Sequence, residues 1–129
     1  MELISTFVCM TKDLGIHNNL FGGILLSKLD ESGVVLVTQI CDTPRMVTLK
    51  MDEVTFKKPV KVGNLIKIYG EPVDIGRSSI TVKIEARKHN VYTGKEKLVC
   101  STKMVFVRID EDGESVPISE RVKKKFGFS

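Results

Sequence analysis

The sequence predicts an α+β fold in which a curved antiparallel β-sheet wraps around one long, buried helix. Apolar residues between positions 20 and 38 recur at helical spacing, and further apolar residues fill the positions between them. A helix that is apolar nearly all round is typically buried. One short apolar segment precedes this helix, and segments that alternate apolar and polar residues follow it, as strands do. A single layer of strands packed against one helix accounts for both patterns.

The predicted elements begin with a strand within residues 2–10 and a turn-rich loop over residues 11–19. The helix is expected from Leu20 to about Thr38. Its β-branched end, Val34–Val37, could also form a strand, but the helical period continues through it and favours a helix.

The strand expected at residues 47–51 alternates apolar and polar side chains, but the apolar parity switches at Val54 and Phe56. Because a one-residue shift moves every side chain to the other face, this switch predicts a bulge near Asp52–Glu53. Three further strands are expected, at about residues 65–73, 79–91 and 97–109. The last has apolar residues on both parities, which is expected when one face packs on the helix and the other meets a neighbour.

Length and composition indicate a single domain over residues 1–129, ending in a short, basic, solvated tail from about residue 119. The 129 residues are 28% charged and 42% hydrophobic, which is typical of a globular protein and argues against disorder. No apolar run is long enough for a membrane span and no secretory signal is visible, so the cytoplasm is the expected location. The chain is small for an enzyme that acts alone, which makes an oligomer the expectation.

The remaining composition narrows the choice of partners. Cys9, Cys41 and Cys100 are widely spaced and form no Cys-x-x-Cys pair, so we expect them to be reduced, buried and inert, with no metal site. The formal net charge of +4 permits a polyanionic partner. Tryptophan is absent and aromatic residues do not interleave with basic ones, which argues against nucleic acid. A phosphate-bearing small molecule fits the charge as well.

A double glycine, Gly22–Gly23, opens the predicted helix, and Asp30 follows two turns later among apolar residues. The first backbone N–H groups of a helix have no intrahelical partner and lie at the positive end of its dipole, so they can hold a developing oxyanion. A carboxylate in apolar surroundings either bears a desolvation cost or faces a cleft, where it can act as an acid or base. The glycines could instead serve only close helix–sheet packing, and Asp30 could be a purely structural cap or ion-pair partner.

Several short motifs occur in order along the chain. They are Asn19-Leu20-Phe21-Gly22-Gly23 leading to Leu29-Asp30, Arg45-Met46-Val47-Thr48-Leu49, Thr55-Phe56-Lys57-Lys58-Pro59-Val60, Val62-Gly63-Asn64 and Gly76-Arg77-Ser78-Ser79. In this order they resemble the signatures of the hotdog-fold acyl-CoA thioesterases, the bacterial short-chain acyl-CoA hydrolases related to the brain acyl-CoA hydrolase. The resemblance spans roughly Val8 to Ile118 and implies the hotdog fold.

The resemblance also implies an activity, the hydrolysis of acyl-CoA to free acid and CoA. In that family the helix start donates a backbone N–H to the thioester carbonyl and the acid on the helix activates or orients water, roles that fall on Gly22, Gly23 and Asp30. Members of that family bind the phosphates of CoA with basic residues in loops. The matching residues are Lys57, Lys58, Arg77, Ser78 and Ser79. No cofactor is implied beyond CoA as part of the substrate and product.

The resemblance extends to assembly, because the active sites of this family lie at dimer interfaces. It implies a homodimer as the active unit and a homohexamer built as a trimer of dimers. The expected partners are therefore acyl-CoA and further copies of this chain, with no nucleic acid and no membrane.

One motif departs from the family pattern. Family members carry Pro-Ser-Asp-Thr-Asn where this chain has Thr11-Lys12-Asp13-Leu14-Gly15, and that Asn is a catalytic group contributed across the dimer. Aligned without a gap, its position is Gly15. A slip in the loop would let His17, Asn18 or Asn19 replace it, since each can position a water or a carbonyl, and Asn18 also stands where glycine is common in the family. The alternative is a non-catalytic acyl-CoA-binding or sensing module.

Overall fold

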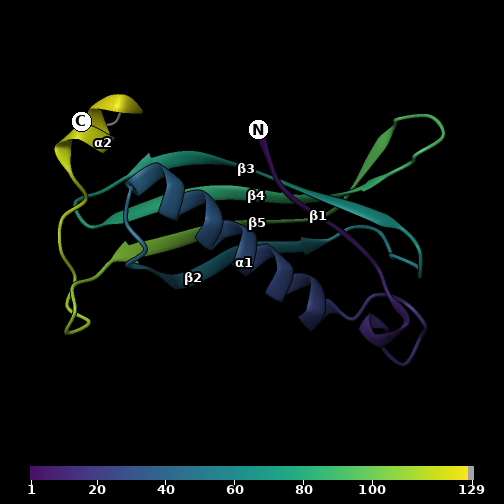
Figure 1. Cartoon of the computed structure of the whole chain (residues 1–129). Helices are drawn as coiled ribbons and strands as arrows, with labels where there is room; N and C mark the ends of the chain where they lie inside the picture. The colour runs from purple at the N-terminus through teal and green to yellow at the C-terminus, as the bar shows by residue number, and fades with distance from the viewer. Residues whose placement is uncertain (128–129) are drawn as a thin grey trace.

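A computed structural model describes residues 1–127 as a five-stranded antiparallel sheet with a long helix across one face (Figure 1). The elements run in the order β1 (Glu2–Val8), a short 3-10 helix (Thr11–Asp13), α1 (Gly22–Cys41), β2 (Met46–Phe56), β3 (Leu65–Ile75), β4 (Ser79–His89), β5 (Glu96–Arg108) and α2 (Glu120–Lys125). The strands lie in the order β1-β3-β4-β5-β2, and every neighbouring pair is antiparallel. β1 and β2 therefore form the two edges, and the predicted α+β fold is confirmed.

α1 packs on the sheet through an apolar stripe at helical spacing. The buried residues of the stripe are Leu25, Leu29, Gly33, Leu36, Val37 and Ile40. Gly33 sets the distance between helix and sheet, because a Cβ atom at this position would lie 2.7 Å from Cζ of the buried Phe106 ring. The sheet contributes the opposing core residues Ile66, Ile68, Ile80, Val82, Ile84, Ala86, Met104 and Phe106. Burial of this apolar surface is the main force that holds the helix on the sheet.

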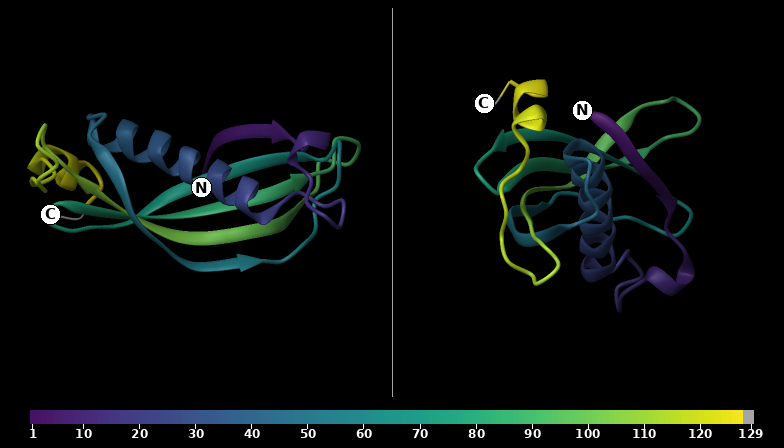
Figure 2. Two further views of the ribbon diagram at one scale, coloured as in Figure 1. Left: turned by 90° about the horizontal axis from the view of Figure 1, so that it is seen from below. Right: turned by 60° about the vertical axis from the view of Figure 1, so that its left-hand side comes forward.

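The helix is longer and less enclosed than the sequence predicted. It begins at Gly22 rather than Leu20, includes the β-branched Val34–Val37 as predicted, and continues past Thr38 to Cys41. Every fourth residue remains exposed in the single chain, which gives the stripe Gly23, Ser27, Glu31, Val35 and Gln39. The prediction of a helix buried on all sides is therefore wrong for one chain, because the sheet covers α1 from one side only (Figure 2). Within residues 1–127, no helix is both long and apolar enough to cross a membrane.

β2 contains the predicted bulge. Its pairing with β5 shifts between Asp52 and Thr55, and Glu53 has a φ of 53°, in the left-handed region. A second shift lies between Thr48 and Lys50. These irregularities bend an edge strand, which is where bulges concentrate.

The other strands follow their predicted positions within a few residues. β3 ends at Ile75 rather than at residue 73, and β4 ends at His89 rather than at residue 91. In β5, the core-facing Met104 and Phe106 alternate with the half-buried Val105 and Val107 on the opposite face. Packing of one face on the helix side is confirmed, and contact of the other face with a neighbour stays a prediction.

The C-terminal segment folds back on the domain, so the expected solvated tail is wrong for the part of it within the described residues. Ser119 caps α2, and its Oγ accepts a hydrogen bond from the Val122 N–H at 3.4 Å. Val122 is buried, Phe126 packs against the core, and Arg121 donates to a carboxylate oxygen of Asp42 at 2.7 Å. Val122 and Phe126 are separated by four residues and lie on the same helix face, but the basic residues around them gave no signal of a buried helix. Residues 128–129 of the expected tail lie outside the described range.

The contact at Gly33 predicts a large loss of stability on substitution. Gly33→Val should lower the free energy of unfolding by about 2–3 kcal/mol, because a β-branched side chain would push α1 away from the Phe106 ring. Lys124→Val, at an exposed position of α2, is the control and should change it by less than about 0.5 kcal/mol. Urea unfolding followed by circular dichroism measures both. Equal stability of the two variants would contradict the packing described here.

Candidate functional site

The start of α1 presents two backbone N–H groups without acceptors. The carbonyl of Phe21 accepts the N–H groups of Ile24 and Leu25 at 3.0 and 3.1 Å. For the N–H groups of Gly22 and Gly23, residues 1–127 provide no hydrogen-bond acceptor. Since they also lie at the positive end of a 20-residue helix, they form a donor site for a developing negative charge.

A groove of about 390 Å³ opens beside these N–H groups. It is lined by Asn19, Leu20 and Gly22 on one side and by Phe56, Lys57, Lys58 and Pro59 on the other. Cζ of Phe56 lies 3.5 Å from the place of a Cβ on Gly22, so any side chain at position 22 would enter the groove.

Both glycines lie against aromatic rings, Gly23 against Phe21 before the helix and Gly22 against Phe56 at the end of β2. A Cβ atom on Gly23 would lie 2.8 Å from Cε2 of Phe21, and Gly22 lies against Phe56. Both rings are largely exposed, at 59% for Phe21 and 53% for Phe56. The helix start is therefore an open, apolar-walled donor site, and the close approach of Gly22 to Phe56 of β2 leaves helix–sheet packing as a second reason for that glycine.

Asp30 is half-buried on α1, and its Oδ1 accepts a hydrogen bond from Thr48 Oγ1 at 2.7 Å. Thr48 belongs to the edge strand β2 and is exposed. Thr48 was not predicted as part of the site, because a threonine on an alternating strand gives no signal of its partner. Asp30 follows Gly23 by seven residues, which places it on the same helix face but about 10 Å further along the axis.

The loop before α1 separates the three candidates for the missing Asn. Gly15 and Asn19 close a tight turn, since the Gly15 N–H donates to the Asn19 carbonyl at 2.8 Å. Asn18 adopts a φ of 59° in this turn and, like His17, is exposed. Asn19 lines the groove, and its side-chain oxygen accepts a hydrogen bond from Lys61 Nζ. Asn18 therefore serves the backbone turn, and of the three candidates only Asn19 lies in the wall of the groove.

The residues predicted to bind phosphate lie at two ends of the sheet. Lys57 and Lys58 follow β2 and line the groove at the helix start. Arg77 and Ser78 lie in the turn between β3 and β4, and Ser79 begins β4. The Arg77 carbonyl accepts the Ile118 N–H at 2.8 Å, close to α2 (Figure 1). The 11 residues of β3 separate the two ends by about 30 Å or more. One chain does not bring the predicted phosphate site together.

The cysteines are excluded as nucleophiles. All three are free and buried. Burial raises the pKa of Cys41 and of Cys100 to about 11. A thiol with such a pKa is almost entirely protonated at neutral pH and is a poor nucleophile. Residues 1–127 hold no cluster of His, Cys, Asp and Glu that could bind a metal ion.

Comparison with known proteins decides the family. The family model described as the thioesterase superfamily matches residues 17–95. This chain belongs to the thioesterase superfamily. It is 31% identical over 116 residues to an uncharacterized acyl-CoA thioester hydrolase of Haemophilus influenzae, covering 88% of this chain and 75% of the relative. It is 30% identical over 120 residues to the acyl-CoA thioester hydrolase YciA of Salmonella typhimurium, covering 91% and 90%.

Solved structures confirm the hotdog fold. A hexameric hotdog-fold thioesterase of Campylobacter jejuni superposes with a TM-score of 0.87 at 34% identity and covers 99% of this chain and 98% of its own. An Asp-to-Ala variant of a hexameric broad-specificity acyl-coenzyme A thioesterase superposes with a TM-score of 0.88 at 28% identity, covering 97% and 94%. An Asn-to-Ala variant of the acyl-CoA hydrolase of Staphylococcus aureus, in complex with coenzyme A, superposes with a TM-score of 0.83 at 25% identity, covering 95% and 75%.

The raised pKa values of the cysteines predict their reactivity. At pH 8 the folded protein should react negligibly with a thiol reagent, and unfolding should expose three reactive thiols. Cys41 and Cys100 have folded pKa values of about 11 against the ordinary 9.0, so the unfolded chain releases these protons first as the pH rises. The free energy of unfolding should therefore fall between pH 9 and 11. Rapid labelling of the native protein at pH 8 would contradict the assignment.

Proposed function

We propose that this chain hydrolyses acyl-CoA thioesters to free carboxylic acid and CoA. The observation that carries the proposal is a single helix with an open pair of N–H groups at Gly22–Gly23 and a half-buried carboxylate at Asp30. Thioester hydrolysis requires a base for water and donors for the tetrahedral oxyanion, and these groups supply both without a metal. Membership of the thioesterase superfamily and the names of the relatives support the same activity.

In the proposed reaction, Asp30 accepts a proton from a water molecule as the water oxygen attacks the thioester carbon. The Thr48 hydroxyl donates to Oδ1 of Asp30 and leaves Oδ2 to face the water. The carbonyl oxygen gains negative charge at the N–H groups of Gly22 and Gly23, which stabilise it together with the helix dipole. Collapse of the intermediate re-forms the carbonyl and breaks the carbon–sulfur bond, and protonated Asp30 returns its proton to the CoA thiolate, which restores the carboxylate.

The separation of these groups supports a site shared by two copies of the chain. Asp30 lies about 10 Å along α1 from Gly23, and its bond to Thr48 directs the carboxylate toward β2 rather than toward the helix start. A base and an oxyanion donor must both lie within hydrogen-bond reach of the same reacting group. We infer that Asp30 of one copy meets the helix start of another.

The edge strand β2 and the exposed stripe of α1 are the surfaces we propose for this pairing. β2 exposes apolar side chains along an edge with unpaired backbone groups, with Val47 at 43%, Leu49 at 62% and Phe56 at 53%. Such an edge readily pairs with a second strand. The hexameric structural neighbours support assembly, and the homodimer as active unit is our proposal.

Asn19 is our candidate for the polar group that the family places at the position of Gly15. Lys61 holds its side-chain oxygen, which leaves its amide N–H groups to donate to a carbonyl in the groove. Asn18 and His17 lack such a position. Lys57 and Lys58, in the same groove, are proposed to meet phosphates of CoA, whereas Arg77, Ser78 and Ser79 could join them only from another copy. Absence of nucleic-acid binding and a cytoplasmic location stay predictions.

The second candidate function is a non-catalytic acyl-CoA-binding or sensing module. Gly15 favours it, since a Cβ atom there would already lie 3.2 Å from the Phe21 ring and the expected amide is missing. Binding of CoA without thiol release from a panel of short- to long-chain acyl-CoAs would select this candidate.

One prediction of the proposed function concerns Asp30. Asp30→Asn should lower kcat for acyl-CoA hydrolysis by about 10²–10⁴-fold, because it removes the general base while keeping the side-chain shape. Thiol release from short- to long-chain acyl-CoAs measures the effect. Glu114→Gln, an exposed carboxylate outside α1 and β2, is the control and should retain activity. An Asp30→Asn variant with full activity and an unchanged oligomer would refute the role of Asp30.

Another prediction distinguishes the roles of Asn19 and Asn18 in the loop before α1. Asn19→Ala should lower kcat by about tenfold or more, because it removes a donor from the groove. Asn18→Gly is the matched control. Its φ of 59° suits glycine, so this variant should keep kcat and fold at least as well. Loss of activity in Asn18→Gly with full activity in Asn19→Ala would reverse the assignment.

A further inference from the structure

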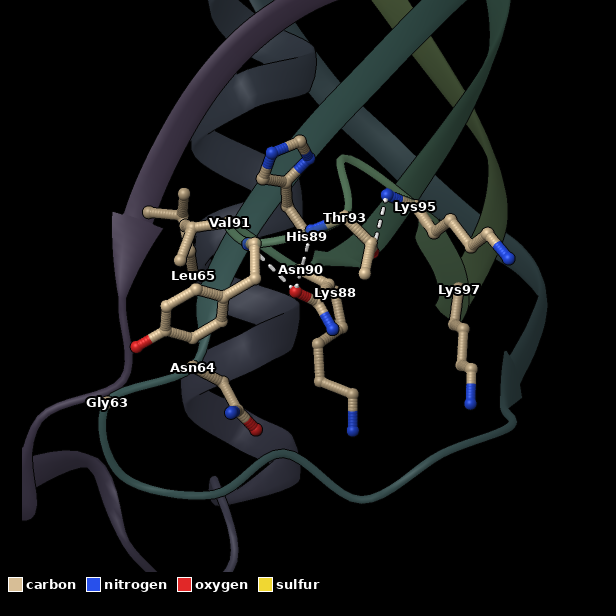
Figure 3. Close-up of a pocket in the computed structure, with 11 residues that line it drawn as sticks. Gly63, Asn64, Leu65, Lys88, His89, Asn90, Val91, Thr93, Lys95 and Lys97 are labelled. Atoms are coloured by element: carbon tan, nitrogen blue, oxygen red, sulfur yellow. Dashed lines mark hydrogen bonds between the residues drawn. The ribbon is translucent and has the colours of Figure 1, made fainter.

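A second and larger groove, of about 700 Å³, lies between the β4–β5 hairpin and the start of β3 (Figure 3). Its lining combines apolar surface with three cations, Lys88 and Lys97 from the hairpin arms and Lys95 from the turn, and Asn64 faces them from the opposite side. No aspartate or glutamate lines it. A concave surface with cations and no carboxylates is suited to an anion.

Two of these lysines form a like-charge pair across the sheet. Lys88 of β4 lies directly opposite Lys97 of β5, and Figure 3 shows the two side chains side by side, extending in the same direction. Like charges directly opposite each other destabilise a sheet. Among the described residues, no carboxylate lies within 4 Å of Lys88, Lys95 or Lys97. The charge at this groove is therefore uncompensated by the chain itself.

Another lysine pair of the same strands shows how the chain compensates such charge elsewhere. Lys83 of β4 lies opposite Lys103 of β5. Lys83 Nζ lies 3.6 Å from a carboxylate oxygen of Glu85, and Lys103 Nζ lies 3.8 Å from one of Glu53. Lys88 and Lys97 have no such carboxylate partner within residues 1–127.

The nearest acid in sequence is already engaged. Glu96 accepts a hydrogen bond from the Tyr69 hydroxyl at 2.7 Å and contacts His89 Nδ1 at 2.6 Å. Its carboxylate is therefore bound to Tyr69 and to His89 at the edge of the groove, and it forms no ion pair with Lys95 or Lys97 on either side of it.

The hairpin tip adds an aromatic surface to the groove. Asn90 Oδ1 accepts the N–H groups of Tyr92 and Thr93 at 2.9 and 3.2 Å, which orders the turn. The Tyr92 side chain lines the groove and is 95% exposed, and Val91 is 65% exposed. An exposed aromatic ring beside cations offers stacking for a base next to contacts for phosphate.

We propose that this groove binds a nucleoside phosphate, with Lys88 and Lys97 on the phosphate groups and Tyr92 beside the base. The nucleoside phosphate has two sources, the nucleotide end of the CoA substrate or a free nucleotide. The residues from Pro59 to Gly63 join this groove to the groove at the helix start, so both open at the same end of the sheet. Binding of the nucleotide end of CoA rests on the proposed function, whereas binding of a free nucleotide does not depend on it.

The test compares two matched double variants, Lys88→Gln/Lys97→Gln and Lys83→Gln/Lys103→Gln. Calorimetry measures the binding of ADP and of CoA, and initial rates are measured with an acyl-CoA and with an acyl-N-acetylcysteamine thioester, which carries no nucleotide. Loss of Lys88 and Lys97 should weaken binding by about tenfold or more, and loss of Lys83 and Lys103 should leave it unchanged. Without ligand, the Lys88→Gln/Lys97→Gln protein should melt no lower than the parent, since a repulsive pair is removed.

The outcomes distinguish the two sources. A raised KM for acyl-CoA with unchanged kcat, and unchanged rates on the nucleotide-free thioester, would assign the groove to CoA. Weaker ADP binding with an unchanged KM for acyl-CoA would assign it to a free nucleotide. Equal affinity of parent and Lys88→Gln/Lys97→Gln for both ligands, or no binding of either ligand to the parent, would overturn the proposal. Binding is measured without turnover, so a parent that binds but releases no thiol contradicts the proposed hydrolysis and not the groove.

Discussion

The contact between Gly33 of α1 and the Phe106 ring of β5 is the constraint on which the rest of the structure depends. With no side chain at position 33, the helix lies directly on the ring, and the apolar stripe from Leu25 to Ile40 is buried along the sheet. This seating brings the start of α1 beside Phe56 at one end of β2 and brings Asp30 beside Thr48 nearer the other. The positions of donor and carboxylate are thus consequences of how the core packs.

The same packing of α1 on the sheet explains why one chain contains the donor groups and the carboxylate of the proposed site but does not bring them together. A helix rises about 1.5 Å per residue, so groups seven residues apart on one face are aligned but separated. The exposed stripe of α1 and the apolar edge of β2 lie on the sides that the sheet does not cover. A second copy that covers them would close the groove and exclude bulk water around the attacking water molecule, which strengthens electrostatic stabilisation.

Much of the fold could be predicted because its signals are local and repeated. The helical period of apolar residues correctly predicted that the helix includes Val34–Val37. The change of apolar residues to the other strand face at Val54 correctly predicted the bulge at Glu53. Side chains whose role depends on a distant partner gave no such signal. Thr48 meets Asp30 only through the packing of helix on strand, and Lys88 faces Lys97 only through the register of β4 with β5.

The errors in prediction have the same origin. Val122 and Phe126 are two apolar residues in a basic segment, too few to form a visible period, yet they fold the C-terminal segment back on the core. Arg77 and Lys57 were grouped by motif, although the length of β3 separates them. Loop candidates for the missing Asn could be ranked only once the turn geometry at Asn18 and the groove at Asn19 were known.

The most direct test of the central claim, a site shared between two chains, is complementation between two inactive variants. Asp30→Asn lacks the base, and Gly22→Val fills the groove beside Phe56. In a mixed pair, one site combines both defects and the other combines the intact Asp30 of one chain with the intact helix start of its partner. The shared site therefore predicts that an equal mixture, dissociated and reassembled, regains about a quarter of the parent activity. No recovery in mixtures shown to contain mixed oligomers would contradict it and place the whole site within one chain.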